Sequence, residues 1–192
     1  MLDKTRSKLY YESEILSKLK SNRFPKFITS YNYNGTKGYI LEYIYGKDFY
    51  EILAKDEYEF SKNEIYNIAE ELLNIIEILQ ENNIVHRDIR TSNVILNENN
   101  QLVLIDFGLA RYIDNNRYLK DVDYWYLADF LLHLYYSSYY PDGDGVERPW
   151  YEELNLNSYE IIFLKKLMAI EKPYKNIEEI RADFDNIKNL NI

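Results

Sequence analysis

Residues 86–108 read HRDIRTSNVILNENNQLVLIDFG, and this stretch decides the fold. It contains two short apolar runs, at 94–96 and 102–105, joined by the Asn-rich polar residues 97–100. Runs of β-branched residues and leucine around such a turn predict a β-hairpin. The hairpin is expected to bring together three side chains from the loops at its outer ends: Asp88, Asn93 and Asp106.

These three residue types suit a divalent cation that is bound together with a phosphate substrate. Mg²⁺ takes oxygen ligands from one or two protein side chains and fills its other positions with water and phosphate oxygens. Asn93 and Asp106 offer such oxygens, which leaves Asp88 free to accept a proton or to orient a hydroxyl group. The competing interpretation is a surface hairpin on which acids fall by chance.

Two strings in this stretch resemble those of a known family. H-R-D-x-x-x-x-N at 86–93 and D-F-G at 106–108 are similar to the catalytic loop and the metal-binding loop of the eukaryotic-type Ser/Thr protein kinase superfamily, including its bacterial-like members. The resemblance implies an α+β, protein-kinase-like fold in one domain. A remnant small lobe at 1–45 would hold the helix called αC and two strands, and a mostly helical C-lobe would follow at 46–192.

The resemblance also implies a nucleotide site with ATP and Mg²⁺ as cofactors. Asp88 would be the catalytic base, Arg90 would lie near the transferred phosphate, and Asn93 and Asp106 would hold the metal. The remaining residues implied at the nucleotide are the gatekeeper Leu41, the hinge residues Glu42 and Ile44, Asp48 facing the ribose, Ile95, and Glu12 of αC. An ordinary strand and loop is the competing interpretation of the hinge, because a hinge works through its backbone.

Composition places the chain among globular proteins. Its 192 residues are 46% hydrophobic and 29% charged, and no apolar run approaches the length of a membrane span. The first residues lack a signal-peptide pattern, and the absence of cysteine excludes disulfides and thiolate metal sites, so we expect a cytoplasmic protein without a membrane partner. The net charge of -9 argues against a general nucleic-acid binder.

The N-terminal part contains one helical pattern and two strand patterns. Residues 8–20 carry apolar positions at helical spacing and predict an amphipathic helix. Glu12 is expected there as the αC glutamate, although Glu14 competes for the role. Two strands are predicted on either side of a turn at Asn34-Gly35, at 27–30 and 38–43.

The rest of the chain is mainly helical in pattern. Ser61, followed by Glu64, forms a capping box ahead of a wide apolar stripe that continues to Asn82. By the resemblance, Asp123 is a buried carboxylate that holds the backbone of the catalytic loop, since such a group persists only when it is hydrogen-bonded. Other helices are expected at 49–55, 125–134, 159–170 and 177–190, with a loop region at 137–157.

The chain departs from the family pattern in two places. Residues 109–122 alone separate the D-F-G string from Asp123, and no Ala-Pro-Glu string occurs, so the platform for a peptide substrate is missing or replaced. Before Glu12 there is neither a G-x-G-x-x-G string nor a strand-borne lysine, which together form the phosphate clamp of a kinase.

Three functions from different classes are consistent with this sequence. The first is a Ser/Thr protein kinase-like phosphotransferase whose missing strands come from a partner chain, or were lost through a truncated gene or a misassigned start. The second is a pseudokinase that acts as a regulatory binding module. The third is a small-molecule kinase, which the short segment after D-F-G favours. A nucleotide is the expected binding partner for all three functions. The first function also requires a protein substrate.

The small lobe is also expected to leave a sheet edge exposed. Such an edge presents unpaired N–H and C=O groups and tends to pair with another strand. We therefore expect a homodimer, or a partner chain that completes the lobe, at this edge.

Overall fold

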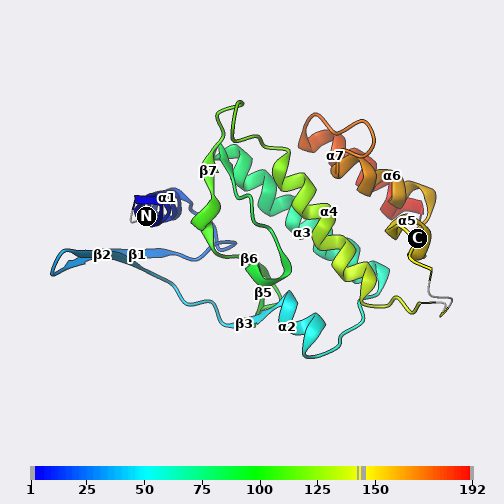
Figure 1. The fold of residues 1–192 in the computed structure, drawn as a ribbon, viewed down its shortest axis with the longest axis horizontal. Coiled ribbons are helices and arrows are strands. Elements are labelled where there is room, and N and C mark those ends of the chain that lie inside the picture. The colour runs from blue at the N-terminus through cyan, green and yellow to red at the C-terminus, as the bar shows by residue number, and fades with distance from the viewer. Residues whose placement is uncertain (1–2, 142, 144–145, 191–192) are drawn as a thin grey trace.

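The computed structural model describes residues 3–141, 143 and 146–190, and side chains at 11–141, 143 and 146–189. The fold is α+β, as predicted, with a large helical part and a small part made of one helix and one hairpin (Figure 1). Among the described residues, no helix is both long enough and apolar enough to cross a lipid bilayer.

The longest helix, α3 (Lys62–Glu81), forms as its sequence pattern requires. The Ser61 side chain accepts a hydrogen bond from the Glu64 N–H, and the Glu64 side chain accepts one from the Ser61 N–H at 2.9 Å. This capping box satisfies N–H groups that a helix start leaves without partners. The apolar stripe of α3 is buried along its whole length: Ile65, Tyr66, Ala69, Leu72, Leu73, Ile75, Ile76 and Leu79.

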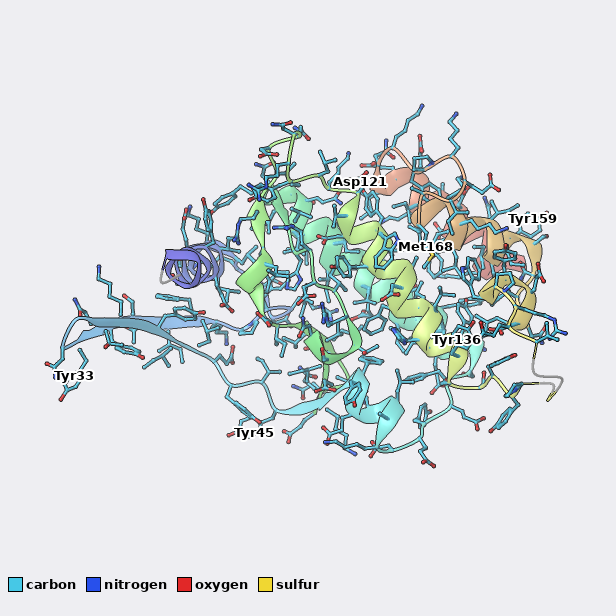
Figure 2. The ribbon with its side chains drawn as sticks, in the orientation of Figure 1. Tyr33, Tyr45, Asp121, Tyr136, Tyr159 and Met168 are labelled. Carbon is cyan, nitrogen blue, oxygen red and sulfur yellow. The ribbon has the colours of Figure 1, made fainter. Side chains whose placement is uncertain are left out.

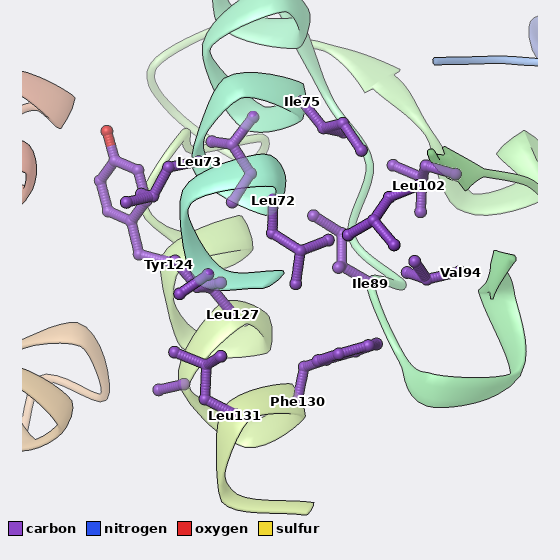
Figure 3. Packing of buried hydrophobic residues seen from close by; sticks show 14 of the residues in the cluster. Leu72, Leu73, Ile75, Ile89, Val94, Leu102, Tyr124, Leu127, Phe130 and Leu131 are labelled. Atoms are coloured by element: carbon purple, nitrogen blue, oxygen red, sulfur yellow. The ribbon is translucent and has the colours of Figure 1, made fainter. Parts of the chain in front are cut away.

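A second helix, α4 (Val122–Tyr136), lies beside α3 and completes the core (Figures 1 and 3). Leu127, Phe130 and Leu131 of α4 lie in one cluster with Leu72 of α3 (Figure 3). Because α4 is apolar on nearly all sides, it is stable only when other elements cover it. The central buried helix predicted at 125–134 is therefore confirmed.

The predicted hairpin lies between this core and the small part. β5 (Val94–Asn97) pairs antiparallel with β6 (Leu102–Leu104), and β3 (Gly46–Asp48) adds to the other edge of β5. Gly46 has a φ of +149°, and a Cβ atom there would lie 2.3 Å from the Leu96 carbonyl oxygen. A side chain at this position would therefore prevent β3 from pairing.

Short elements carry the loops at the outer ends of this hairpin. β4 (Ile84–Val85) precedes the loop at 86–93, which the family resemblance implies is the catalytic loop and whose last residues form η1 (Thr91–Asn93). η2 (Phe107–Leu109) follows β6, and β7 (Arg111–Tyr112) then pairs antiparallel with β4. β7, which follows the loop that carries Asp106, thus pairs with β4, which precedes the loop that carries Asp88.

The C-terminal helices partly correct the prediction. α6 (Ser158–Leu167) and α7 (Ile177–Leu190) match it closely, but the predicted loop at 137–157 contains the helix α5 (Trp150–Glu153). Four residues are too few to show helical periodicity, so this helix had no pattern to find.

Glu160 ties the C-terminal helices to α3. Its buried carboxylate accepts hydrogen bonds from the Tyr66 hydroxyl at 2.7 Å, from Lys62 Nζ at 2.9 Å and from the Asn157 N–H at 2.7 Å. A buried carboxylate needs such partners. It therefore fixes α6 to the start of α3.

The small part consists of α1 (Asp3–Lys18) and a hairpin of β1 (Phe27–Tyr33) and β2 (Thr36–Leu41). Both strands pair antiparallel, and the turn residues Asn34 and Gly35 have φ of +49° and +79°, as a two-residue hairpin turn requires. α1 begins before the predicted residue 8. In Figure 1 the hairpin projects from the body alongside α1. The chain returns to the helical part through β3 and α2 (Phe49–Ala54).

Candidate active site

The catalytic loop is held by Asp123, at the start of α4. Its two carboxylate oxygens accept the backbone N–H groups of His86 at 2.8 Å and Arg87 at 2.7 Å. Arg87 has a φ of +68°, a left-handed conformation that costs energy for a residue with a side chain. The two hydrogen bonds that Asp123 accepts stabilise this conformation, and they confirm the role predicted for Asp123.

Burial of Asp123 has an electrostatic consequence. The side chain is fully buried, and this burial raises the pKa of its carboxyl group to about 6, although the His86 and Arg87 N–H groups and the Arg87 charge oppose the rise. The carboxylate is therefore still ionised at neutral pH. In this form it accepts both N–H groups.

His86 joins the catalytic loop to the loop that carries Asp106. Its buried ring meets the edge of the Phe107 ring with centroids 4.7 Å apart. Burial lowers the pKa of His86 to about 4, despite the nearby Asp106 charge, so the ring is neutral at pH 7. The ring therefore acts as a packing group between the two loops.

Asp88, Arg90 and Asn93 form one cluster within the catalytic loop. Asn93 Nδ2 donates to the Asp88 backbone carbonyl and to Asp88 Oδ2, both at 3.0 Å. The Arg90 guanidinium forms an ion pair with Asp88 Oδ1. Asp88 and Asn93 are each 8% exposed, whereas more than half of the Arg90 side chain faces solvent. The catalytic residues implied by the resemblance therefore do lie together.

Asp106 belongs to the neighbouring loop. The Ile105 N–H donates to the Asn93 carbonyl at 2.9 Å, which puts Asp106 one residue from a direct bond to the catalytic loop. Asp106 has a left-handed backbone with φ of +58°, and its Oδ1 accepts the Gly108 N–H at 3.1 Å. The side chain is exposed.

The donor set fits Mg²⁺ bound together with a phosphate substrate. Both hydrogen bonds described for Asn93 use the amide nitrogen, so its amide oxygen is left for another ligand. Within the described residues, no three or more His, Asp or Glu side chains form a metal-binding group. The two ligands that the resemblance implies, Asn93 and Asp106, would leave the other positions of Mg²⁺ to phosphate oxygens and water.

The predicted hinge follows β2. Leu41, the last residue of β2, packs partly buried against the core. The Glu42 N–H donates to the Lys26 carbonyl at 2.9 Å, and Glu42 Oε2 accepts the Lys26 N–H at 3.2 Å. Glu42 and Ile44 are both half-buried, and Ile44 lies in the irregular segment that follows β2.

The strand pairing brings Asp48 and Ile95 side by side. They are register partners in the β3–β5 ladder, and both are half-buried. Asp48 also has a local task that the sequence analysis did not assign, since its Oδ1 accepts the Glu51 N–H at 2.7 Å and caps α2. One carboxylate oxygen is thus committed to the helix.

Glu12 reaches the Asp106 loop from α1. Its Oε1 accepts the Phe107 N–H at 3.2 Å, and its Oε2 accepts the Tyr39 hydroxyl. Burial raises the pKa of Glu12, and the negative charge of Asp106 adds to the rise, while these two hydrogen bonds oppose it. Glu14 instead pairs with Lys18 at 2.6 Å. Of the two acids that competed for this role, Glu12 is therefore the one directed at the loop.

Tyr39 is the residue that sequence reasoning missed. Side chains two apart on a strand share a face, so its spacing from Leu41 was the available signal. That spacing does not show that the Tyr39 hydroxyl binds a residue of α1.

Comparison with known proteins agrees with this geometry. A family model described as Protein kinase domain matches residues 1–145. A Bacillus subtilis (strain 168) protein named "Probable serine/threonine-protein kinase YbdM" is 31% identical over 188 residues, which are 95% of this chain and 73% of that protein.

Eukaryotic relatives match shorter stretches. "Serine/threonine-protein kinase RUNKEL" of Arabidopsis thaliana is 32% identical over 115 residues, 59% of this chain and 8% of that protein. "Dual specificity protein kinase zakA" of Dictyostelium discoideum is 31% identical over 107 residues, 55% of this chain and 14% of that protein. The chain thus spans most of the bacterial relative and a small fraction of these two.

Proposed function

This chain belongs to the protein kinase family, and from that premise we propose that it is an ATP-dependent phosphotransferase of the Ser/Thr protein kinase type. The observation that carries the proposal is the adjacency of two loops. One holds Asp88 and Asn93, the other holds Asp106, and the backbone bond between Asn93 and Ile105 joins them.

Each residue has a chemical task in this proposal. Asp88 accepts the proton of the acceptor hydroxyl, and its near-burial and its bond from Asn93 support that role because they fix the orientation of the carboxylate. Asn93 and Asp106 hold the metal through oxygen atoms. Mg²⁺, when bound with ATP, supplies positive charge that offsets the phosphate charge. Arg90 adds a planar cation beside Asp88.

A pseudokinase is the second candidate, and two contacts favour it. The hydrogen-bond donors described for Glu12 are an uncharged hydroxyl and a peptide N–H, so its charge is not used to hold a cation. The ion pair between Arg90 and Asp88 also occupies the base. A small-molecule kinase remains the third candidate, because few residues separate η2 from α4.

The hairpin supports a further part of the proposal, a strand partner. β1 and β2 form a two-stranded sheet, so each has one edge without a strand partner among the described residues. Two-stranded hairpins are marginally stable alone. We therefore expect a second copy or a partner chain to pair along this edge. Light scattering that finds a monomer at all concentrations would contradict pairing between copies.

The test of the enzyme proposal is Mg²⁺-dependent ATP hydrolysis or autophosphorylation by the purified chain. Asp88→Asn should lower kcat by roughly 10²–10⁴-fold, because it removes the base. Asp106→Ala should abolish the Mg²⁺-dependent activity, because it removes a ligand proposed for the metal. Asp185→Ala, an exposed acid on α7, is the matched control and should behave like the wild type.

Two other results would replace the proposal. Thermal stabilisation by Mg²⁺·ATP without any turnover would favour the pseudokinase. Phosphorylation of sugars or amines, but of no protein, would identify a small-molecule kinase.

A further inference from the structure

Glu12 is a half-buried acid, and the hydrogen-bond donors described for it are uncharged. The Tyr39 hydroxyl donates to one carboxylate oxygen and the Phe107 N–H donates to the other at 3.2 Å. Glu12 therefore links the hairpin to the loop that carries Asp106. Both bonds end on the same Glu12 carboxylate. A shift of the Tyr39 hydroxyl therefore moves the carboxylate, and with it the acceptor of the Phe107 N–H.

The strand register explains why Tyr39 can reach Glu12. Tyr39 is opposite Ser30 in the β1–β2 ladder, and its side chain lies on the face of the hairpin that packs against α1. Tyr31, opposite Gly38 in the same ladder, is one register step away, so its side chain lies on the other face and is 48% exposed. The two tyrosines thus differ in face and in contact, although both belong to the same hairpin.

The Asp106 loop needs such a link because its backbone is strained. Asp106 has a left-handed backbone with φ of +58°, a conformation that is less favourable for a residue with a Cβ atom than for glycine. Among the hydrogen bonds that oppose relaxation of this loop are the one from the Gly108 N–H to Asp106 Oδ1 and the one from the Phe107 N–H to Glu12. The second depends on where Glu12 is held.

We propose that Tyr39 is a positioning residue: its hydroxyl holds Glu12, and through Glu12 it holds Phe107 and the metal-binding Asp106 in place without a cationic side chain. The part that concerns the metal rests on the proposed function above. The anchoring itself does not, because it is a property of the protein without ligand.

The first test is amide hydrogen exchange by NMR on the full chain. Tyr39→Phe removes only the hydroxyl, and the Phe107 amide should then exchange about 10-fold faster or more, corresponding to about 1.4 kcal/mol of lost protection. Tyr31→Phe, the matched control on the opposite face, should leave that amide unchanged. Equal exchange at Phe107 in the wild type and Tyr39→Phe would overturn the proposal.

A second variant separates hydrogen bonding from charge. In Glu12→Gln the amide oxygen can accept the Phe107 N–H, and the NH₂ group can donate to the Tyr39 oxygen. Protection at Phe107 should therefore stay near the wild-type level. The double variant Glu12→Gln with Tyr39→Phe should lose it. Loss of protection in Glu12→Gln alone would mean that the charge of Glu12 matters, and it would overturn an anchor made of uncharged donors.

Calorimetric titration with Mg²⁺·ATP separates this inference from the proposed function. Tyr39→Phe should weaken binding about 10-fold and raise the Mg²⁺ concentration required, while Tyr31→Phe should not. A wild type that binds no Mg²⁺·ATP, with exchange effects as expected, would refute the function and leave the anchor intact. Wild-type binding that Tyr39→Phe leaves unchanged would overturn the role at the metal site.

Discussion

The helical part and the β1–β2 hairpin use similar side chains in opposite ways. α3 buries its entire apolar stripe, and Leu72, Leu73, Ile75 and Ile76 are completely inaccessible. In β1 every residue after Phe27 is exposed, including Ile28 at 60% and Tyr33 at 73%. Hydrophobic residues stabilise a fold only where neighbours cover them. The helical part therefore contains its own core, and the hairpin depends on α1 and on contacts beyond itself.

The candidate active site lies where these two regions meet. Asp123 of α4 holds the catalytic loop through buried hydrogen bonds, and within that loop Asn93 donates to Asp88. Glu12 and Tyr39 reach the same site from the small part. The catalytic loop thus has a rigid support, whereas the Asp106 loop is shared between a stable region and an exposed one. Four experiments test this contrast.

The largest expected effect is in the helical core. Leu72→Ala should lower the free energy of unfolding by about 3–5 kcal/mol, because Leu72 is completely buried between α3 and α4 and the change leaves a cavity (Figure 3). Urea denaturation measures this. A loss below about 1 kcal/mol would mean that this region is not packed as a core.

The second largest effect is expected at Asp123, whose carboxylate holds the catalytic loop. Asp123→Asn keeps the shape but replaces one acceptor oxygen by an NH₂ group, which faces the N–H of His86 or Arg87. One buried donor then lacks a partner, so we expect a loss of about 2–3 kcal/mol in chemical denaturation. Asp129→Asn, half-exposed on the same helix, is the control and should change little.

The third effect is a pH dependence that belongs to the helical part. Below pH 6.5 unfolded His86 binds a proton that the folded protein does not bind until about pH 4, so stability falls as the pH drops through this window. His86→Phe should remove this contribution, on the order of 2 kcal/mol between pH 7 and pH 5.

Asp123 has the opposite effect on stability. Because its pKa is raised in the folded state, the folded protein binds this proton at a higher pH than the unfolded chain does, which favours folding as the pH falls. It is present in both proteins, so the difference between their unfolding curves isolates His86. Parallel stability curves from pH 7 to pH 5 would contradict a buried neutral His86.

The smallest effect is expected at the tip of the hairpin. Tyr33 lies at the far end of the hairpin in Figure 2 and is largely exposed. Tyr33→Ser should change the free energy of unfolding by less than about 0.5 kcal/mol in urea denaturation. A loss comparable to that of Leu72→Ala would show that the hairpin tip is covered in solution, and it would remove the contrast between the two regions.

Local patterns were enough to predict much of this fold. The hairpin of β5 and β6, the capping box of α3 and the glycine turn after Asn34 all follow from neighbouring residues. The role of Asp123 followed from family resemblance. The first turns of α1 did not follow from the sequence, because residues 3–7 contain no apolar position to show a helical period. The helix α5 is too short to show a period, and the addition of β3 to β5 depends on a distant segment.

The sequence by itself determined the two acid-bearing loops, their order and the family to which they belong, because these are written in residue types a few positions apart. Only the tertiary structure decided which of Glu12 and Glu14 meets the Asp106 loop, and that the Tyr39 hydroxyl binds it there. The physical reason is distance along the chain. Tyr39 and Phe107 both donate hydrogen bonds to Glu12 because a hairpin, a helix and a loop pack together, and no local sequence pattern predicts contacts between segments so far apart.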